Sequence, residues 1–169
     1  MTSYGKFVDF VRDGDWQNAL EEINSGNVCS ATVAADSSVF TWLIDINAPS
    51  SLILELMSSC SRLESVELDR FDVLRKCMEE SYAKSNAFNT FSKALKWGLD
   101  PNVYWDGSTL LQKAIEMNRV REISELLLHG ADPFKLSLFG RESTSSIDDA
   151  LESGNDASSV LLNHVNVAK

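Results

Sequence analysis

The feature that most constrains this chain is a segment that recurs with a period of about 33 residues. Its clearest copy is Asp106–Pro133, which reads DGSTLLQKAIEMNRVREISELLLHGADP. The dipeptide Asp-Pro begins at Asp100 and again at Asp132, 32 positions apart, and Gly107 and Gly140 lie 33 positions apart. Self-similarity of this kind is typical of stacked repeats, in which no single repeat buries its apolar face alone. The sequence therefore predicts a stack of helix–turn–helix repeats.

Two motifs in this segment resemble the ankyrin-repeat family. Residues 109–114, TLLQKA, are similar to the Thr-Pro-Leu-His-x-Ala signature that opens the first helix, with Leu110 replacing the Pro and Gln112 replacing the His. Residues 122–133, EISELLLHGADP, are similar to the end of the second helix and its Gly-Ala-Asp-Pro turn. The resemblance implies an all-α fold, an ankyrin-like helix–turn–helix solenoid with short hairpin loops. It also implies a surface that binds another protein.

We expect a single domain over residues 1–169 with about five degenerate repeats, approximately 4–26, 39–60, 69–101, 104–133 and 137–166. In the second repeat, Thr41–Ile46 has the signature spacing, with Ile46 in the place of the signature Ala. Cys77 and Ala150 take that place in the third and fifth repeats, and Asp156 is expected to cap the last helix. The alternative is an irregular helical bundle that shares the same turn chemistry.

The charge balance limits the possible partners. The chain has 25 acidic and 15 basic residues, a formal net charge of −10 and a pI near 4.6. Nucleic-acid binding needs clustered Lys and Arg against the phosphates, so we expect no direct nucleic-acid contact and a basic protein partner instead. We find no apolar run long enough for a membrane span and no signal-peptide pattern in Met1–Lys6, and expect a cytoplasmic protein that is a monomer when free.

The sequence does not favour an enzyme. Its only histidines, His129 and His164, lie at the ends of second helices, where a cation interacts favourably with the helix dipole. We find no metal-ligand spacing and no Gly-rich phosphate loop, so we expect no catalytic residue, no metal and no cofactor. Cys29, Cys60 and Cys77 are widely spaced, which favours buried free thiols over disulfides or a zinc site.

A candidate binding groove follows from the repeat alignment. In ankyrin-like stacks, partners usually meet the hairpin tips and the exposed face of the first helices, which here includes the position two residues after the signature Ala. This position holds Glu79, Glu116 and Glu152 in three repeats and Ala48 in an earlier one, with Met117 beside it. The pattern predicts an acidic ladder that attracts a basic partner. The alternative is a solvated helix face, since Glu is a good helix former.

The predicted hairpin tips supply aromatic and Arg side chains, which dominate many interfaces. These candidates are Tyr104, Trp105 and Asp106 in one hairpin and Phe139 and Arg141 in the next. Trp105 is the first choice as an anchor, because the family pattern gives a Trp at that place no role in the core; the alternative is packing on the neighbouring hairpin. The other tryptophans lie on apolar helix faces and are expected in the core: Trp16, Trp42 and Trp97.

Taken together, these features favour a protein-binding module. Its size and acidity suit a stoichiometric inhibitor, such as an immunity-type protein, that captures a basic partner through an acidic concave face. The alternatives are a DNA mimic that inhibits a nucleic-acid-binding protein, a small adaptor subunit, and a small enzyme.

Overall fold

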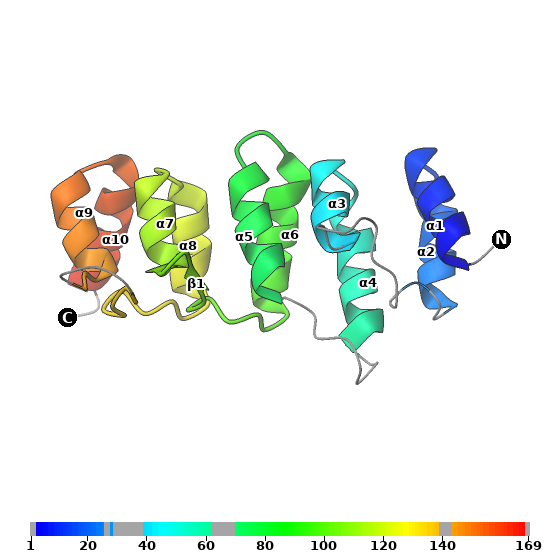
Figure 1. The fold of residues 1–169 in the computed structure, drawn as a ribbon. Helices are drawn as coiled ribbons and strands as arrows, with labels where there is room; N and C mark the ends of the chain where they lie inside the picture. Colours follow the sequence, from blue (N-terminus) through cyan, green and yellow to red (C-terminus); the bar gives the residue numbers. More distant parts are fainter. Residues whose placement is uncertain (1–2, 26–27, 29–38, 62–69, 139–142, 168–169) are drawn as a thin grey trace. The chain divides into compact units, whose positions relative to one another are not determined.

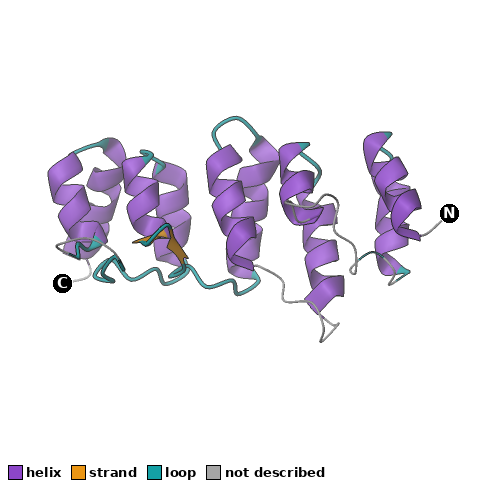
Figure 2. Ribbon diagram, in the orientation of Figure 1, coloured by secondary structure: helices purple, strands orange, loops and turns teal. Residues whose placement is uncertain are grey.

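The structure, a computed structural model, describes residues 3–25, 28, 39–61, 70–138 and 143–167 (Figure 1). These residues form ten helices and one two-stranded sheet (Figure 2). The helices are α1 (Ser3–Arg12), α2 (Trp16–Asn24), α3 (Val39–Asp45), α4 (Ser50–Ser61), α5 (Arg70–Glu80), α6 (Ser85–Lys96), α7 (Leu110–Glu116), α8 (Val120–Leu128), α9 (Ser146–Ser153) and α10 (Asp156–Val167), and the strands are β1 (Tyr104–Trp105) and β2 (Ser108–Thr109). The chain is mostly helical, as an all-α class predicts.

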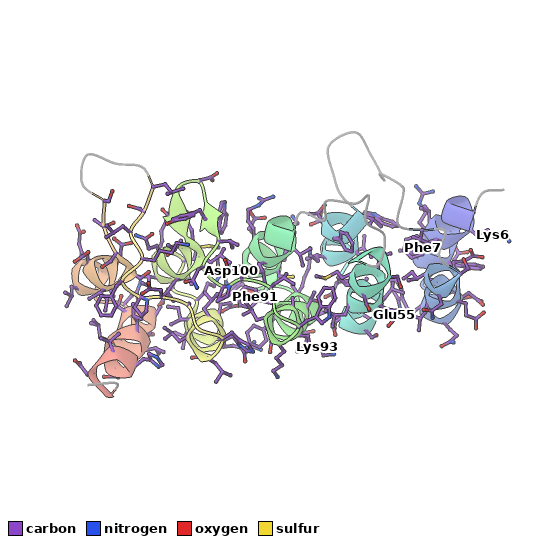
Figure 3. The ribbon with its side chains drawn as sticks, turned by 90° about the horizontal axis from the view of Figure 1, so that it is seen from below. Lys6, Phe7, Glu55, Phe91, Lys93 and Asp100 are labelled. Atoms are coloured by element: carbon purple, nitrogen blue, oxygen red, sulfur yellow. The ribbon has the colours of Figure 1, made fainter. Side chains whose placement is uncertain are left out.

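The chain divides into two compact units, an N-terminal unit of residues 1–93 and a C-terminal unit of residues 94–169. In the N-terminal unit, α2 packs against α1 and α4, and α3 packs against α4 and α5. Two of its fully buried side chains are Phe7 on α1 and Phe91 on α6, both labelled in Figure 3. Lys93 of α6 also donates a hydrogen bond to the Ser50 hydroxyl of α4, at 3.1 Å.

In the C-terminal unit, first helices contact first helices and second helices contact second helices. The helix α7 packs against α8 and α9, and α10 packs against α8 and α9. The apolar residues Leu110, Leu111 and Ile115 of α7 are buried, as are Ile123 and Leu126 of α8. Their spacing of three and four residues gives each helix one apolar face. Burial of these faces against neighbouring helices therefore accounts for the pairing.

The turn between the two helices of a pair repeats closely between the two units. Asn47 and Asn118 both have positive φ, 56° and 52°, a conformation that Asn tolerates better than most residues. The next backbone N–H then returns to the first helix, from Ala48 to Leu43 at 2.9 Å and from Arg119 to Ala114 at 2.7 Å. These bonds align Leu43, not Ile46, with the signature Ala114.

The expected register of the second repeat is therefore wrong by three residues. Ile46 is 40% exposed and follows α3, whereas Leu43 is fully buried. Ala48, expected in the groove, is fully buried, and Asp45 takes the position two residues after Leu43. The physical reason is that the left-handed turn at Asn47 ends the helix earlier than the signature spacing indicated.

Two further predictions are wrong in detail. Asp156 lies within the first turn of α10, and its neighbour Asn155 caps the helix instead, since the Asn155 Oδ1 atom accepts the Ser158 N–H at 2.8 Å. Trp97 is 43% exposed rather than in the core, because it follows the last residue of α6. Trp16 and Trp42 are only partly buried and line an open hollow.

The prediction of a buried free thiol is confirmed for Cys77, which is fully buried in α5 and makes no disulfide. Burial raises the pKa of this thiol well above its ordinary range, because the interior disfavours the thiolate. Cys29 and the side chain of Cys60 lie outside the described residues.

Candidate functional site

The candidate site begins at the hairpin of the C-terminal unit. The strands β1 and β2 pair antiparallel, with Tyr104 opposite Thr109 and Trp105 opposite Ser108. Asp106 and Gly107 form the turn, with φ values of 49° and 82°. Two consecutive positive φ angles define the type I′ turn, which Asp-Gly favours. The local sequence thus explains why the hairpin forms here.

The two aromatic residues of the hairpin have different environments. Trp105 is half-buried, and the Lys113 ammonium of α7 lies 5.7 Å from the centroid of its ring. Tyr104 contacts the next loop: its hydroxyl donates to the Leu136 carbonyl at 3.1 Å, and the Lys135 ammonium lies 4.4 Å from its ring centroid. Tyr104 therefore holds the loop that follows α8, whereas Trp105 lies against Lys113 of α7.

Gln112 connects α7 to Thr144, just before α9, and to α9 itself. Its Oε1 atom accepts the Thr109 N–H at 2.8 Å, and Thr109 Oγ1 accepts the Gln112 N–H, which completes a capping box. Its Nε2 atom donates to the Thr144 carbonyl at 3.0 Å and to Asp149 at 2.9 Å. This glutamine, in the place of the signature His, thus makes hydrogen bonds from one helix pair to the next.

The helix α9 begins with the same type of cap. Ser145 and Asp148 exchange hydrogen bonds in a second capping box. These bonds, from the Ser145 hydroxyl and backbone to the carboxylate, lower the pKa of Asp148. Because α7 and α9 start in the same way, Glu116 and Glu152 occupy equivalent positions along the two helices.

Asparagine side chains tie the two helix pairs of the C-terminal unit at their other end. The Asn155 amide donates to the Ile115 carbonyl at 2.8 Å, and the Asn118 carbonyl oxygen accepts the Ala157 N–H at 3.0 Å. Together with Gln112, these bonds fix α9 and α10 beside α7.

Between α7 and α9 lies an open hollow of about 230 Å³, which we call the acidic hollow. Its lining residues are Ser108, Gln112, Ile115, Glu116, Asp149, Glu152 and Ser153. Of these described residues, three are carboxylates and none is basic. Two members of the expected acidic ladder, Glu116 and Glu152, therefore meet at one place. Glu116 also pairs with Lys113 at 2.9 Å, and Met117 lies beside it, half-buried.

The third expected member, Glu79, lies in a charged network of the N-terminal unit. Glu79 pairs with Arg75 at 3.0 Å, and Lys76 pairs with Asp45 at 2.7 Å and with Glu80 at 3.2 Å. Lys84 joins the network through Glu80 at 2.7 Å. Three carboxylates thus face three cations, and the network is close to neutral.

The pKa values reflect this pairing. The hydrogen bond from Lys76 to Asp45 raises the pKa of Lys76, and the hydrogen bond from Lys84 lowers the pKa of Glu80. Both units therefore carry a carboxylate at the position two residues after the signature Ala. In the N-terminal unit, its negative charge is offset by cations of α5 and of the turn after α5.

Sequence reasoning missed two surface features. Three apolar side chains of the loop after α8 are exposed, Phe134, Leu136 and Leu138. The other feature is a hollow of about 460 Å³ in the N-terminal unit, whose apolar lining includes Trp16, Trp42 and Ile46. The exposed apolar side chains could have been suspected from the sequence, because apolar residues at positions 134, 136 and 138 alternate with polar ones. Phe139 and Arg141, expected at a hairpin tip, lie outside the described residues.

Over the part of the chain that the structure describes, no group of three His, Cys, Asp or Glu residues is arranged to hold a metal ion. No described helix combines the length and apolarity needed to cross a bilayer. Comparison of the chain with protein-family models, curated proteins and solved structures finds no match.

Proposed function

We propose that this chain is an ankyrin-like solenoid that binds a basic protein. The observation that carries the proposal is the acidic hollow, where Glu116 of α7 and Glu152 of α9 line one open space from equivalent positions. Asp149 adds a third carboxylate, and Trp105 is a half-buried aromatic residue on the hairpin just before α7. A concave acidic surface beside an aromatic side chain suits a partner with exposed Lys or Arg.

An inhibitory role fits this mode of binding. A chain of 169 residues with a net charge of −10 can cover a basic surface of its partner and repel other copies of itself. The complex would then contain one copy of this chain, and the partner's basic surface would be blocked.

The test is retention of a partner from an extract of the native cells on the immobilised chain, at low and at high salt. The variant Trp105→Ala plus Glu116→Lys is compared with wild type, and Glu21→Lys on the exposed face of α2 is the charge control. We expect one basic protein that the wild type and the control retain, that the variant loses, and that salt weakens. Equal retention by the variant would contradict the proposed surface.

A further inference from the structure

We propose that the C-terminal unit docks a peptide segment of its partner in which large apolar residues adjoin a lysine or arginine. This inference rests on the proposed function and identifies the chemistry of the partner. The docking surface joins the acidic hollow to an apolar row, which we define as Phe134, Leu136 and Leu138.

The apolar row is exposed to solvent. Phe134, Leu136 and Leu138 are 62%, 53% and 55% exposed. The two residues between them make hydrogen bonds within the C-terminal unit. Lys135 donates to the Asn102 carbonyl at 2.6 Å, and the Ser137 hydroxyl accepts the Thr144 N–H at 3.2 Å. Lys135 and Ser137 thus anchor the segment, while the three apolar side chains remain exposed. Neighbouring large apolar side chains exposed in this way are typical of interaction surfaces.

The segment is also held in place before any partner binds. The Leu136 carbonyl accepts the Tyr104 hydroxyl, and the Ser137 N–H donates to the Thr144 carbonyl at 2.9 Å. Asp132 fixes the start of the segment, since its carboxylate accepts the Phe134 N–H at 2.9 Å. A preformed surface loses little conformational entropy on binding, which favours affinity.

The apolar row lies next to one edge of the acidic hollow. The Leu138 N–H donates to the Gly107 carbonyl at 2.7 Å, and the next residue, Ser108, is part of the hollow's lining. A bound segment that covers Leu138 therefore reaches the carboxylates of Glu116, Asp149 and Glu152 within a few residues.

The charge of the acidic hollow indicates which class of partner binds to this surface. The hollow is lined by three carboxylates, and the cation beside it, Lys113, pairs with one of them, Glu116. This excess of carboxylates favours an ammonium or guanidinium group from the partner. Nucleic acid is repelled by the same carboxylates, and a second copy of this chain brings a further net charge of −10. A protein segment with Lys or Arg next to apolar side chains matches both parts of the surface: its apolar side chains can pack on the apolar row, and its cation can enter the acidic hollow.

The test is selection from a random peptide library displayed on phage, with the full chain as bait. Synthetic versions of the enriched peptides are then measured by fluorescence anisotropy against three variants and two controls. The variants are Leu136→Ser plus Leu138→Ser, Glu116→Gln plus Glu152→Gln, and Phe134→Ser as a milder change to the row. The controls are Leu128→Ser, an exposed leucine on α8, and Glu21→Gln on α2. Thermal melting followed by circular dichroism verifies that each protein is folded.

We expect the enriched peptides to join Lys or Arg to large apolar residues. Each double variant should weaken their binding by about tenfold or more, whereas the controls bind as wild type does. No enrichment, enrichment of peptides without basic residues, or unchanged binding by either folded double variant would overturn the inference. So would a dimer in ultracentrifugation that the leucine variant disrupts, because a second copy would then cover the row.

The two proposals fail in different ways. If the extract experiment retains a partner that depends on Trp105 and Glu116 but not on Leu136 and Leu138, the proposed function stands and the apolar row has no part in it. If the extract yields no partner, the proposed function itself fails.

Discussion

At residue 112, a buried glutamine uses both ends of its amide to join three segments of the C-terminal unit. Its oxygen caps α7 through the Thr109 N–H, and its nitrogen binds Thr144 and Asp149. The amide supplies both an acceptor and a donor from one side chain, which is why Gln112 can make all three contacts.

Replacing this side chain tests its importance. We expect Gln112→Ala to lower the free energy of unfolding by about 2 kcal/mol, because it leaves the buried Thr109 N–H without its acceptor. Gln112→Glu should also destabilise at pH 7, since the new carboxylate would face Asp149, and should recover as the pH falls toward about 4. Urea denaturation measures both, with exposed Gln17→Ala as the control. A loss no larger than the control's would refute this role.

Cys77 gives a second prediction at this scale. Its thiol is fully buried and its pKa is raised, so little reactive thiolate is present in the folded protein. In a Cys29→Ser plus Cys60→Ser background, we expect Ellman's reagent to react with Cys77 far more slowly in buffer than in concentrated urea. Similar rates in the two conditions would show that α5 opens readily and that the burial is not maintained in solution.

At the scale of the elements, α3 and α5 are joined by charges as well as by apolar packing. Lys76 of α5 lies at the centre of this network, between Asp45 of α3 and Glu80 at the end of α5. These side chains are well under half exposed except for Asp45, at 47%. A network of this kind is expected to stabilise more than an isolated surface pair does.

The pH dependence of this network follows from the two pKa shifts. The raised pKa of Lys76 means that its contribution is complete below the ordinary lysine pKa, near 10.4, and is lost as the pH rises through the folded value. The lowered pKa of Glu80 means that its contribution is present above the ordinary glutamate pKa, near 4.3, and is lost as the pH falls through the folded value. The network therefore stabilises the fold between these limits.

Lys76→Met is the corresponding test, because methionine keeps much of the apolar stem and removes the charge. At pH 7 we expect a loss of about 1 kcal/mol, shrinking in high salt and toward both extremes of pH. Thermal melting across pH measures it, with exposed Lys96→Met on α6 as the control. A difference from wild type that stays constant with pH would show that packing, not charge, is lost.

The elements also show what the sequence can and cannot predict. The helix pairs followed from apolar spacing and from Gly and Pro at the turns. The burial of Leu52, Ile53, Leu56 and Met57, for example, gives α4 one apolar face. The register of the second repeat did not follow, because the signature spacing does not show that Asn47 adopts the left-handed conformation that ends the turn. The ion pair of Glu79 with Arg75, four residues earlier on the same helix, was readable from helix spacing and was overlooked. The ion pair of Lys76 with Asp45 could not be read in this way, because the two residues lie on different helices.

The candidate binding surface could likewise be predicted only in part from the sequence. The sequence identified Glu116 and Glu152 because they share a repeat position, and both do line the acidic hollow. It missed Phe134, Leu136 and Leu138, because the exposure of a loop residue depends on which neighbours anchor the backbone. Here Lys135, Ser137 and Tyr104 supply those anchors.

At the scale of the whole molecule, stability is expected to be local. The chain divides into two compact units, and in the repeat stack that we propose each helix pair draws its stability from its immediate neighbours. Leu126→Ala, which removes a fully buried side chain of α8, should cost about 3 kcal/mol. We expect hydrogen exchange measured by mass spectrometry to quicken across the C-terminal unit well before it quickens across residues 1–93. Equal acceleration in both units would show that the chain unfolds as a single block.

The hydrogen bonds at both ends of the contact between α7 and α9 have a consequence for selectivity. Gln112 fixes the hairpin end, and Asn155 and Asn118 fix the turn end, so the two helices cannot readily spread apart. In the proposed binding mode, the acidic hollow would then keep a nearly constant width. A planar guanidinium and a compact ammonium differ in shape and in hydrogen-bond geometry, so a hollow of constant width would accept one better than the other. Exchange of Arg for Lys in a bound peptide should then change its affinity even though the charge is the same.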